Sequence, residues 1–277
     1  GGRGGFQQWP PPVIDAGADE VGKHIVGIGI SGLYGGSGVP LAENMEPVRP
    51  DLIWMDRRAQ EETEWVKEHV DGKRLTEITG NDVVDPYYGY TKILWIKNHE
   101  PENWRKIRMF LPPSNYAIYQ LTGKVSIDHS AAGNLGGLYD VNTNTWSKEM
   151  LDAMGIPESM MPEPLVDSTT IVGGLTNDAA AELGLAAGTP IISGGVDVGA
   201  ANVGMGVFKP GKYVAAIGSS MNAALVSEEP IKGQGLIVWP YPYNSEHLVY
   251  NFSGSATAGA ITKWFRDNIG DLEVHNQ

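Results

Sequence analysis

Short apolar runs recur along this chain between turns rich in glycine and proline, and they predict strands that alternate with helices. Strands are expected over residues 24–30, 52–54, 109–111, 171–174, 189–193, 212–217, 236–238 and 248–252. Amphipathic or small-residue patterns predict helices over residues 59–70, 92–99, 115–121, 146–154, 179–185 and 254–269. Alternation of this kind is typical of an α/β fold.

The stretch from Gly188 to Gly206 combines a predicted buried strand, a glycine turn and the predicted start of a helix. Asp197 stands between the strand end and the helix start, where open α/β sheets place their ligand sites. A carboxylate at this point could accept a proton from a hydroxyl or hold a metal ion. It could equally cap the helix. The stretch by itself leaves both interpretations open.

Composition and charge narrow the class of protein. The chain has 277 residues, 42% of them hydrophobic and 19% charged, which is globular and long enough for two domains. The net charge of -13 argues against nucleic-acid or anionic membrane partners, although local amides and Mg²⁺ would still permit a phosphate substrate. The absence of cysteine excludes disulfides and thiolate catalysis. No apolar run is long enough to span a membrane and no signal pattern opens the sequence, so we expect a cytoplasmic protein.

Two loops rich in glycine and serine follow predicted strands. The loop 31–38 lacks the Gly-Lys-Ser/Thr ending and the glycine spacing of nucleotide fingerprints, so it predicts either a phosphate or sugar cradle or a tight crossing. The loop 218–222 offers amides and hydroxyls to phosphate oxygens, or forms only a turn.

Charged residues follow the predicted strand 52–54. Asp56, Arg57 and Arg58 could hydrogen-bond a polyol, because carboxylates accept from hydroxyls and guanidinium groups donate in a fixed fork. A helix cap beside two surface arginines is the alternative, and the residues alone favour it. His129 is interpreted as a loop residue rather than a ligand, because no second histidine or carboxylate stands at metal-binding spacing.

An ordered series of segments resembles the FGGY family of carbohydrate kinases, and within it the xylulose kinase branch. The segments are Ile28–Gly36, Leu52–Ala59, Asp85–Tyr88 with Thr91–Trp95, Leu121–Lys124 with Asp128, Gly173 with Leu185–Asp197, Gly218–Ser220, and the small-residue helix ending in Trp264–Asp267. The resemblance covers nearly all residues from 24 to 269 and keeps the order of the family.

The resemblance implies an actin-like fold of two α/β domains of the ribonuclease H type, with sugar and ATP meeting between them. Residues 1–207 would form the N-terminal sugar-binding domain without its opening strand pair, and residues 208–277 the beginning of an incomplete C-terminal ATP-binding domain. The implied reaction is ATP-dependent and Mg²⁺-dependent phosphorylation of a sugar or polyol hydroxyl, with a pentulose such as xylulose as the first expectation. Phosphoryl transfer depends on positioning and charge neutralisation more than on covalent chemistry, so one base, Mg²⁺ and amide-rich loops suffice.

The same resemblance assigns roles to single residues. Asp197 matches the general base and, with it, a Mg²⁺ ligand, which moves its interpretation away from a helix cap. The residues that match sugar contacts are Tyr34, Gly35, Asp56, Arg57, Arg58 and Tyr87. Those that match the loop at the ATP phosphates are Gly218, Ser219 and Ser220. Xylulose kinases usually have Met-His where this chain has Tyr34-Gly35, a departure that bears on the choice of sugar.

Two further departures concern the ends of the chain. The family's Asp-x-Gly-Thr loop has no counterpart before His24, and its adenine-binding segment is not found before Gln277. We therefore expect a chain truncated at both ends, whose unpaired sheet edges favour association, for example as a homodimer. A non-catalytic sugar-binding or interaction module is the alternative to a kinase. A hydrolase ranks third, because no Gly-x-Ser-x-Gly elbow stands at a strand end.

Overall fold

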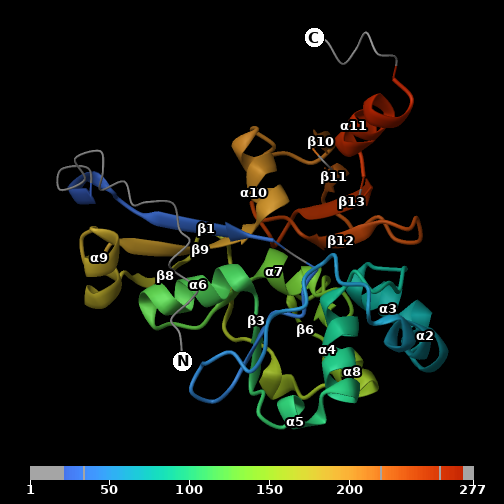
Figure 1. Cartoon of the computed structure of the whole chain (residues 1–277), viewed down its shortest axis with the longest axis horizontal. Helices are drawn as coiled ribbons and strands as arrows, with labels where there is room; N and C mark the ends of the chain where they lie inside the picture. The colour runs from blue at the N-terminus through green and yellow to red at the C-terminus, as the bar shows by residue number, and fades with distance from the viewer. Residues whose placement is uncertain (1–21, 34, 219, 256, 271–277) are drawn as a thin grey trace.

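The computed structural model describes residues 22–33, 35–218, 220–255 and 257–270, so the predictions for Tyr34 and Ser219 lie outside the described residues. Within these ranges, no helix combines the length and the apolar character needed to cross a bilayer. Two sheets dominate the structure, one around β9 and one around β13, and most of the helices of the first half lie on one side of them (Figure 1).

The first sheet has three strands in the order β1–β9–β8. Strand β1 (Ile28–Gly32) runs parallel to β9 (Pro190–Val196), and β8 (Ile171–Gly174) runs antiparallel to β9. Helices α6 (Pro113–Thr122) and α9 (Asn177–Leu183) cover this sheet, and their apolar residues enclose a small core with Ile191. The end of β9 therefore belongs to a strand that is paired on both sides and packed against the core.

A register shift interrupts the pairing of β1 with β9 shortly before β9 ends. Ile28 pairs with Ile191, whereas Ser31 pairs with Gly195, so β9 carries an extra residue at this bulge. Gly194 has a φ of 69° there, and a Cβ atom at this position would lie 1.8 Å from the carbonyl oxygen of Ile30. Only glycine fits. Two residues later β9 ends, and Asp197 begins helix α10 (Asp197–Gly204).

The second sheet is antiparallel, with the strand order β10–β11–β13–β12. Its strands are β10 (Lys212–Ile217), β11 (Met221–Ser227), β12 (Ile237–Pro240) and β13 (Val249–Ser255). Trp239, Tyr250 and Phe252 pack together on its inner face, where all three are buried. Helix α7 (His129–Asn134) lies against β12, and a Cβ atom at Gly133 would come within 2.9 Å of the Trp239 side chain.

The remaining helices and small ladders lie in the helical layer, except for α11, which stands on the far side of the second sheet (Figure 1). The helices are α2 (Gln60–His69), α3 (Gly72–Thr79), α4 (Gly89–His99), α5 (Pro101–Trp104), α8 (Lys148–Met154) and α11 (Gly259–Asn268), with short 3₁₀ turns at Gly22–His24 and Glu158–Met160. The ladders pair β2 (Val39–Leu41) with β3 (Met109–Leu111), β4 (Ile127–Asp128) with β7 (Leu165–Val166), and β5 (Tyr139–Asp140) with β6 (Thr145–Trp146).

Most predicted elements are confirmed, and the strands at 109–111, 171–174 and 212–217 have the expected bounds. Glycine or proline stands at or next to an end of each of these runs, and this marks the strand bounds in the sequence. The predicted strand 24–30 is displaced, since β1 begins at Ile28.

Three predictions are wrong. Residues 52–54 lie outside strands: the Leu52 carbonyl accepts from Ser37 N–H, and Ile53 begins a turn closed by Asp56 N–H. His129 is the first residue of α7 rather than a loop residue, because the carboxylate of Asp128 caps that helix by accepting from the Ala131 N–H. Strand β11 was missed, because Met221 and Asn222 were included in the preceding loop.

Candidate functional site

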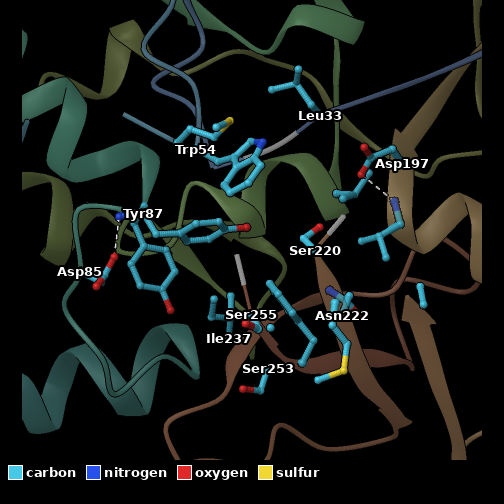
Figure 2. A pocket seen from close by; sticks show the side chains of 18 of the residues that line it. Leu33, Trp54, Asp85, Tyr87, Asp197, Ser220, Asn222, Ile237, Ser253 and Ser255 are labelled. Carbon is cyan, nitrogen blue, oxygen red and sulfur yellow. Dashed lines mark hydrogen bonds between the residues drawn. The ribbon is translucent and has the colours of Figure 1, made fainter. Parts of the chain in front are cut away.

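A cleft of about 850 Å³ lies where the two sheets and the loops of the helical layer meet (Figure 2). Its walls include the residue after β1, the loop around Trp54, the loop before α4, the junction of β9 and α10, and the hairpin joining β10 to β11. Strands β12 and β13 close its floor with Ile237, Trp239 and Phe252. Residues far apart in the chain thus share one cavity.

Asp197 lines this cleft at the carboxyl end of β9. Its Oδ1 accepts from the N–H of the next residue, Val198, at 2.6 Å, a contact that is not a helix cap. Partial burial raises the pKa of Asp197, and the hydrogen bond from Val198 opposes this shift. The carboxylate therefore remains available to a ligand, with a basicity above that of an ordinary aspartate.

A hydrogen bond from helix α7 fixes the peptide that precedes Asp197. The Val196 N–H donates to the hydroxyl of Ser130 at 3.1 Å, and that hydroxyl donates to the buried carboxylate of Asp128. Burial raises the pKa of Asp128 to about 6, although the Ser130 hydroxyl and the Ala131 N–H favour its ionised form. Helix α7 thus holds the strand end that presents Asp197.

Tyr87 forms the facing wall, and its hydroxyl points into the cleft (Figure 2). Its N–H donates to Asp85 Oδ1 at 2.7 Å, and Asp85 in turn receives two hydrogen bonds from Arg57, at 2.7 and 3.0 Å. Burial raises the pKa of Tyr87, and the negative charge of Asp197 raises it further, so the phenol stays protonated. It can then donate to or accept from a bound hydroxyl.

Of the three consecutive charged residues predicted to contact sugar, only Arg57 lines the cleft. Asp56 and Arg58 pair with each other, at 2.8 Å between carboxylate and guanidinium, and Arg58 stacks 4.7 Å above the ring of Trp95. The hydrogen bond from Arg58 lowers the pKa of Asp56. Asp56 and Arg58 therefore do not join the cleft lining. The alternative of a helix cap is wrong as well, because Ala59 precedes α2 and no side chain caps that helix.

Gly35 supports Tyr87 from behind rather than lining the cleft. It has a φ of 71°, and a Cβ atom there would lie 2.9 Å from the Tyr87 ring and 3.0 Å from Trp54 Cβ. Its N–H donates to Asn134 Oδ1 at 2.9 Å, and its carbonyl accepts from Lys92 Nζ at the same distance. Lys92 and Asn134 were not predicted as site residues.

Gly218 and Ser220 lie at the tip of the hairpin between β10 and β11. Ser220 stands on the opposite side of the cleft from Tyr87 (Figure 2). The Gly218 N–H donates to the Ser220 carbonyl at 2.8 Å and is used within the hairpin. The Ser220 side chain is exposed and lines the cleft, as does that of Asn222 in β11. The hairpin therefore offers hydroxyl and amide groups to a ligand.

The side chains around Asp197 determine whether the cleft could hold a metal ion. Among residues 22–270 outside the gaps at 34, 219 and 256, no three His, Cys, Asp or Glu side chains gather in a metal cluster. Mg²⁺ in phosphoryl-transfer enzymes takes one or two carboxylates, with waters and substrate phosphates as its other ligands. Two carboxylates line the cleft, and Asp85 is engaged by Arg57 and the Tyr87 N–H. Asp197 is left to meet that requirement and would not by itself form a resident metal site.

Comparison with known proteins places this site in a family. The model of the N-terminal domain of the FGGY family of carbohydrate kinases matches residues 14–204. Xylulose kinase of Bacillus subtilis is 30% identical over 280 residues, which are 98% of this chain and 54% of that relative. Glycerol kinase of Brucella ovis is 29% identical over 240 residues, or 84% of this chain and 47% of that relative.

Solved structures agree with the sequence comparison. A "xyloylose kinase" from Brucella ovis is 26% identical with a TM-score of 0.84, over 95% of this chain and 53% of that one. Plasmodium falciparum glycerol kinase with ADP has a TM-score of 0.79 at 21% identity, over 90% of this chain and 50% of that one. The chain spans about half the length of these relatives. This protein therefore belongs to the FGGY family of carbohydrate kinases and has their actin-like α/β fold.

Proposed function

We propose that this chain contributes the sugar site and the general base of an ATP-dependent carbohydrate kinase, and that the acceptor is a pentulose of the xylulose type. The observation that carries this proposal is the position of Asp197, which faces Tyr87 and the tip of the β10–β11 hairpin in one cleft. An acceptor hydroxyl and a phosphoryl donor would meet there. The names of the xylulose kinase relatives support the class of acceptor.

The proposed chemical step is a proton transfer to Asp197. Its Oδ1 is engaged by the Val198 N–H, so the second carboxylate oxygen is the atom that would accept the proton of the sugar hydroxyl. The raised pKa of Asp197 makes it a better acceptor than an ordinary aspartate near neutral pH. Its position at a strand end fixed by Ser130 limits motion away from the attacking oxygen.

Sugar binding is assigned to Tyr87 and Arg57, which line the cleft. Gly35 is proposed to position the Tyr87 ring, and Tyr34 remains a proposed contact on the family resemblance. Asp56 and Arg58 are assigned no direct contact, because they pair with each other and Arg58 stacks on Trp95.

Residues 208–277 are proposed as the beginning of the ATP-binding domain. The Ser220 hydroxyl faces the cleft and would hold phosphate oxygens, together with Ser219. Gly218 would shape the hairpin tip, because its N–H donates to the Ser220 carbonyl and its carbonyl accepts from the Gly259 N–H. Mg²⁺ beside Asp197 would neutralise charge on the transferred phosphoryl group. The family match ends at residue 204, which supports a boundary near residue 207.

A coupled ATP-turnover assay with Mg²⁺ tests this function, with D-xylulose, other pentuloses and polyols as acceptors and Asp197→Ala as the control. Sugar-dependent turnover that disappears in the control is the expected result. Sugar binding by calorimetry without turnover would instead support the alternative, a non-catalytic sugar-binding module. A folded chain with neither turnover nor sugar binding would overturn both.

A further inference from the structure

Lys92 is a fully buried cation beneath the cleft wall that the proposed reaction does not use. It lies in α4 with 0% of its surface exposed. Its ammonium group donates to the carbonyl of Gly35 at 2.9 Å, to that of Tyr87 at 2.7 Å, and to that of Pro86. These carbonyls belong to two loops that are more than fifty residues apart in sequence, and a single side chain ties the loops together.

The tie determines the position of the Tyr87 ring. Gly35 is held on both sides, by Asn134 at its N–H and by Lys92 at its carbonyl. The Tyr87 ring packs so closely on Gly35 that a Cβ atom there would be 2.9 Å away. Tyr87 is itself held at its own carbonyl by the same ammonium group. A shift of either loop would therefore move the aromatic wall of the cleft.

An ammonium group has three N–H bonds, and the three nearest carbonyls use all of them, with the Tyr88 carbonyl more distant at 3.5 Å. No donor remains for a ligand, so Lys92 cannot be a sugar contact. We propose that Lys92 is a positioning residue that locks the Gly35 loop to the Tyr87 loop and thereby preorganises the sugar-binding wall. This inference rests on the proposed function, because it assigns the wall to sugar.

Charged groups from several elements face this ammonium group. Asp56, Asp51 and Asp85 favour its charged form, and Arg57 disfavours it. Burial outweighs them and lowers the pKa of Lys92 to about 7. A neutral amine has only two N–H bonds, so one carbonyl would lose its donor. The lock should then loosen as the pH rises through about 7.

The same helix offers a matched control. Lys97 Nζ donates to the carbonyls of Met154 at 3.1 Å and Gly155 at 2.8 Å, and burial also lowers its pKa. It anchors the end of α8, away from the cleft lining. Lys97→Met removes the same chemistry as Lys92→Met without touching either cleft loop.

The test compares the wild type, Lys92→Met and Lys97→Met by calorimetry with D-xylulose and by amide hydrogen exchange without ligand. Lys92→Met should weaken D-xylulose binding about tenfold, because buried carbonyls lose their donor and the wall moves. Exchange should rise in segments 35–37 and 85–88. Lys97→Met should leave both readouts as in the wild type.

Chemical rescue separates positioning from packing. Because the chain has no cysteine, Lys92→Cys can be alkylated in the unfolded state at residue 92 alone and then refolded. Bromoethylamine restores a side chain of lysine length that ends in an amine, and bromopropane gives a similar side chain without it. Only the aminoethyl form should recover D-xylulose affinity and protection of the two segments.

Equal D-xylulose affinity in Lys92→Met and the wild type, or recovery with the propyl form, would overturn the proposal. If the wild type binds no sugar, the proposed function fails first, and the positioning of a sugar wall fails with it. If Lys92→Met does not fold, the two alkylated forms of Lys92→Cys decide, because they differ only in the terminal amine. Equal protection of segments 35–37 and 85–88 in the aminoethyl and propyl forms would refute the lock.

Discussion

The two walls of the cleft differ in how deeply their supports are buried. Behind Tyr87, the side chains of Tyr88, Tyr90 and Lys92 are 1%, 1% and 0% exposed. On the hairpin side, Ile217 and Tyr213 are 71% and 69% exposed, and every residue of α11 from Ala260 to Asn268 is exposed. The first wall is fixed by packing and buried hydrogen bonds, whereas the hairpin depends mainly on its backbone ladder.

The difference teaches that the two proposed binding tasks, sugar on one wall and phosphate on the other, have different demands on the scaffold. A sugar offers only small hydroxyl groups, so its site must be rigid before binding to discriminate among them. A phosphate carries charge that a hairpin tip can meet with backbone and hydroxyl groups. The contrast between a preformed wall and a lightly supported one can be tested by substitution.

The largest effect is expected at Asp197, where the two walls meet. Asp197→Asn should lower kcat for sugar-dependent ATP turnover by about 10²–10⁴, because a general base is lost. D-xylulose affinity should change by less than about threefold, since the wall at Tyr87 is untouched. Steady-state kinetics and calorimetry measure the two quantities. A loss confined to sugar affinity would contradict the role of base.

A pair of tryptophans compares the packed floor of the cleft with the exposed helix α11 that follows β13. Trp239, 1% exposed, fills the core of the second sheet, and Trp264, 57% exposed, lies on α11. Trp239→Ala should lower the free energy of unfolding by about 3–5 kcal/mol. Trp264→Ala should change it by about 0.5 kcal/mol or less. Urea unfolding followed by circular dichroism tests both, and equal losses would erase the contrast.

Asp128 provides a pH test of the buried side. Its pKa lies at about 6 in the folded chain and 3.8 is the ordinary value, so the folded state holds the proton more tightly. The stability it contributes is therefore full below about pH 4, falls as the pH rises to about 6, and stays low above that. Asp128→Asn should remove this dependence, a difference of about 1–3 kcal/mol between pH 4 and pH 7. Unfolding free energies of both proteins at the two pH values measure it, and parallel pH profiles would contradict the assignment.

The smallest effect distinguishes two neighbouring arginines. Arg57→Ala should weaken D-xylulose binding by about threefold to fivefold, because the side chain lines the cleft and pairs with Asp85 at a solvent-exposed position. Arg58→Ala should leave D-xylulose affinity unchanged, because that guanidinium stacks on Trp95. Calorimetric titration of both variants suffices. A stronger effect at Arg58 would restore the sequence prediction of sugar contacts at both arginines.

Patterns over a few neighbouring residues predicted features that depend only on those residues, such as the strand that ends before Asp197. Asp197 follows a strand end, as predicted. The glycine turn predicted after residue 193 is wrong, because Gly194 and Gly195 lie within β9, where they form its bulge. The same approach could not separate Arg57 from Arg58. Their directions depend on Asp85 and Trp95, which lie in later segments of the chain.

Lys92 lies in one of the segments that resemble the family, yet its role could not be predicted from the sequence. In a helical pattern it resembles any surface lysine, and its carbonyl partner at Gly35 is set by the tertiary fold. Strand β11 was missed for a different reason, since a three-residue hairpin leaves too short a turn to mark the start of the next strand.

The bulge at Gly194 has a consequence for sequence variation. A carbonyl oxygen 1.8 Å from the missing Cβ, together with a φ of 69°, leaves no room for any side chain. A saturation library at this codon should therefore return glycine alone among folded, active clones. Deleting the residue would shift the strand by one position and turn the following carboxylate toward the opposite face of the sheet. One hydrogen atom in place of a side chain thus decides which way the proposed base points.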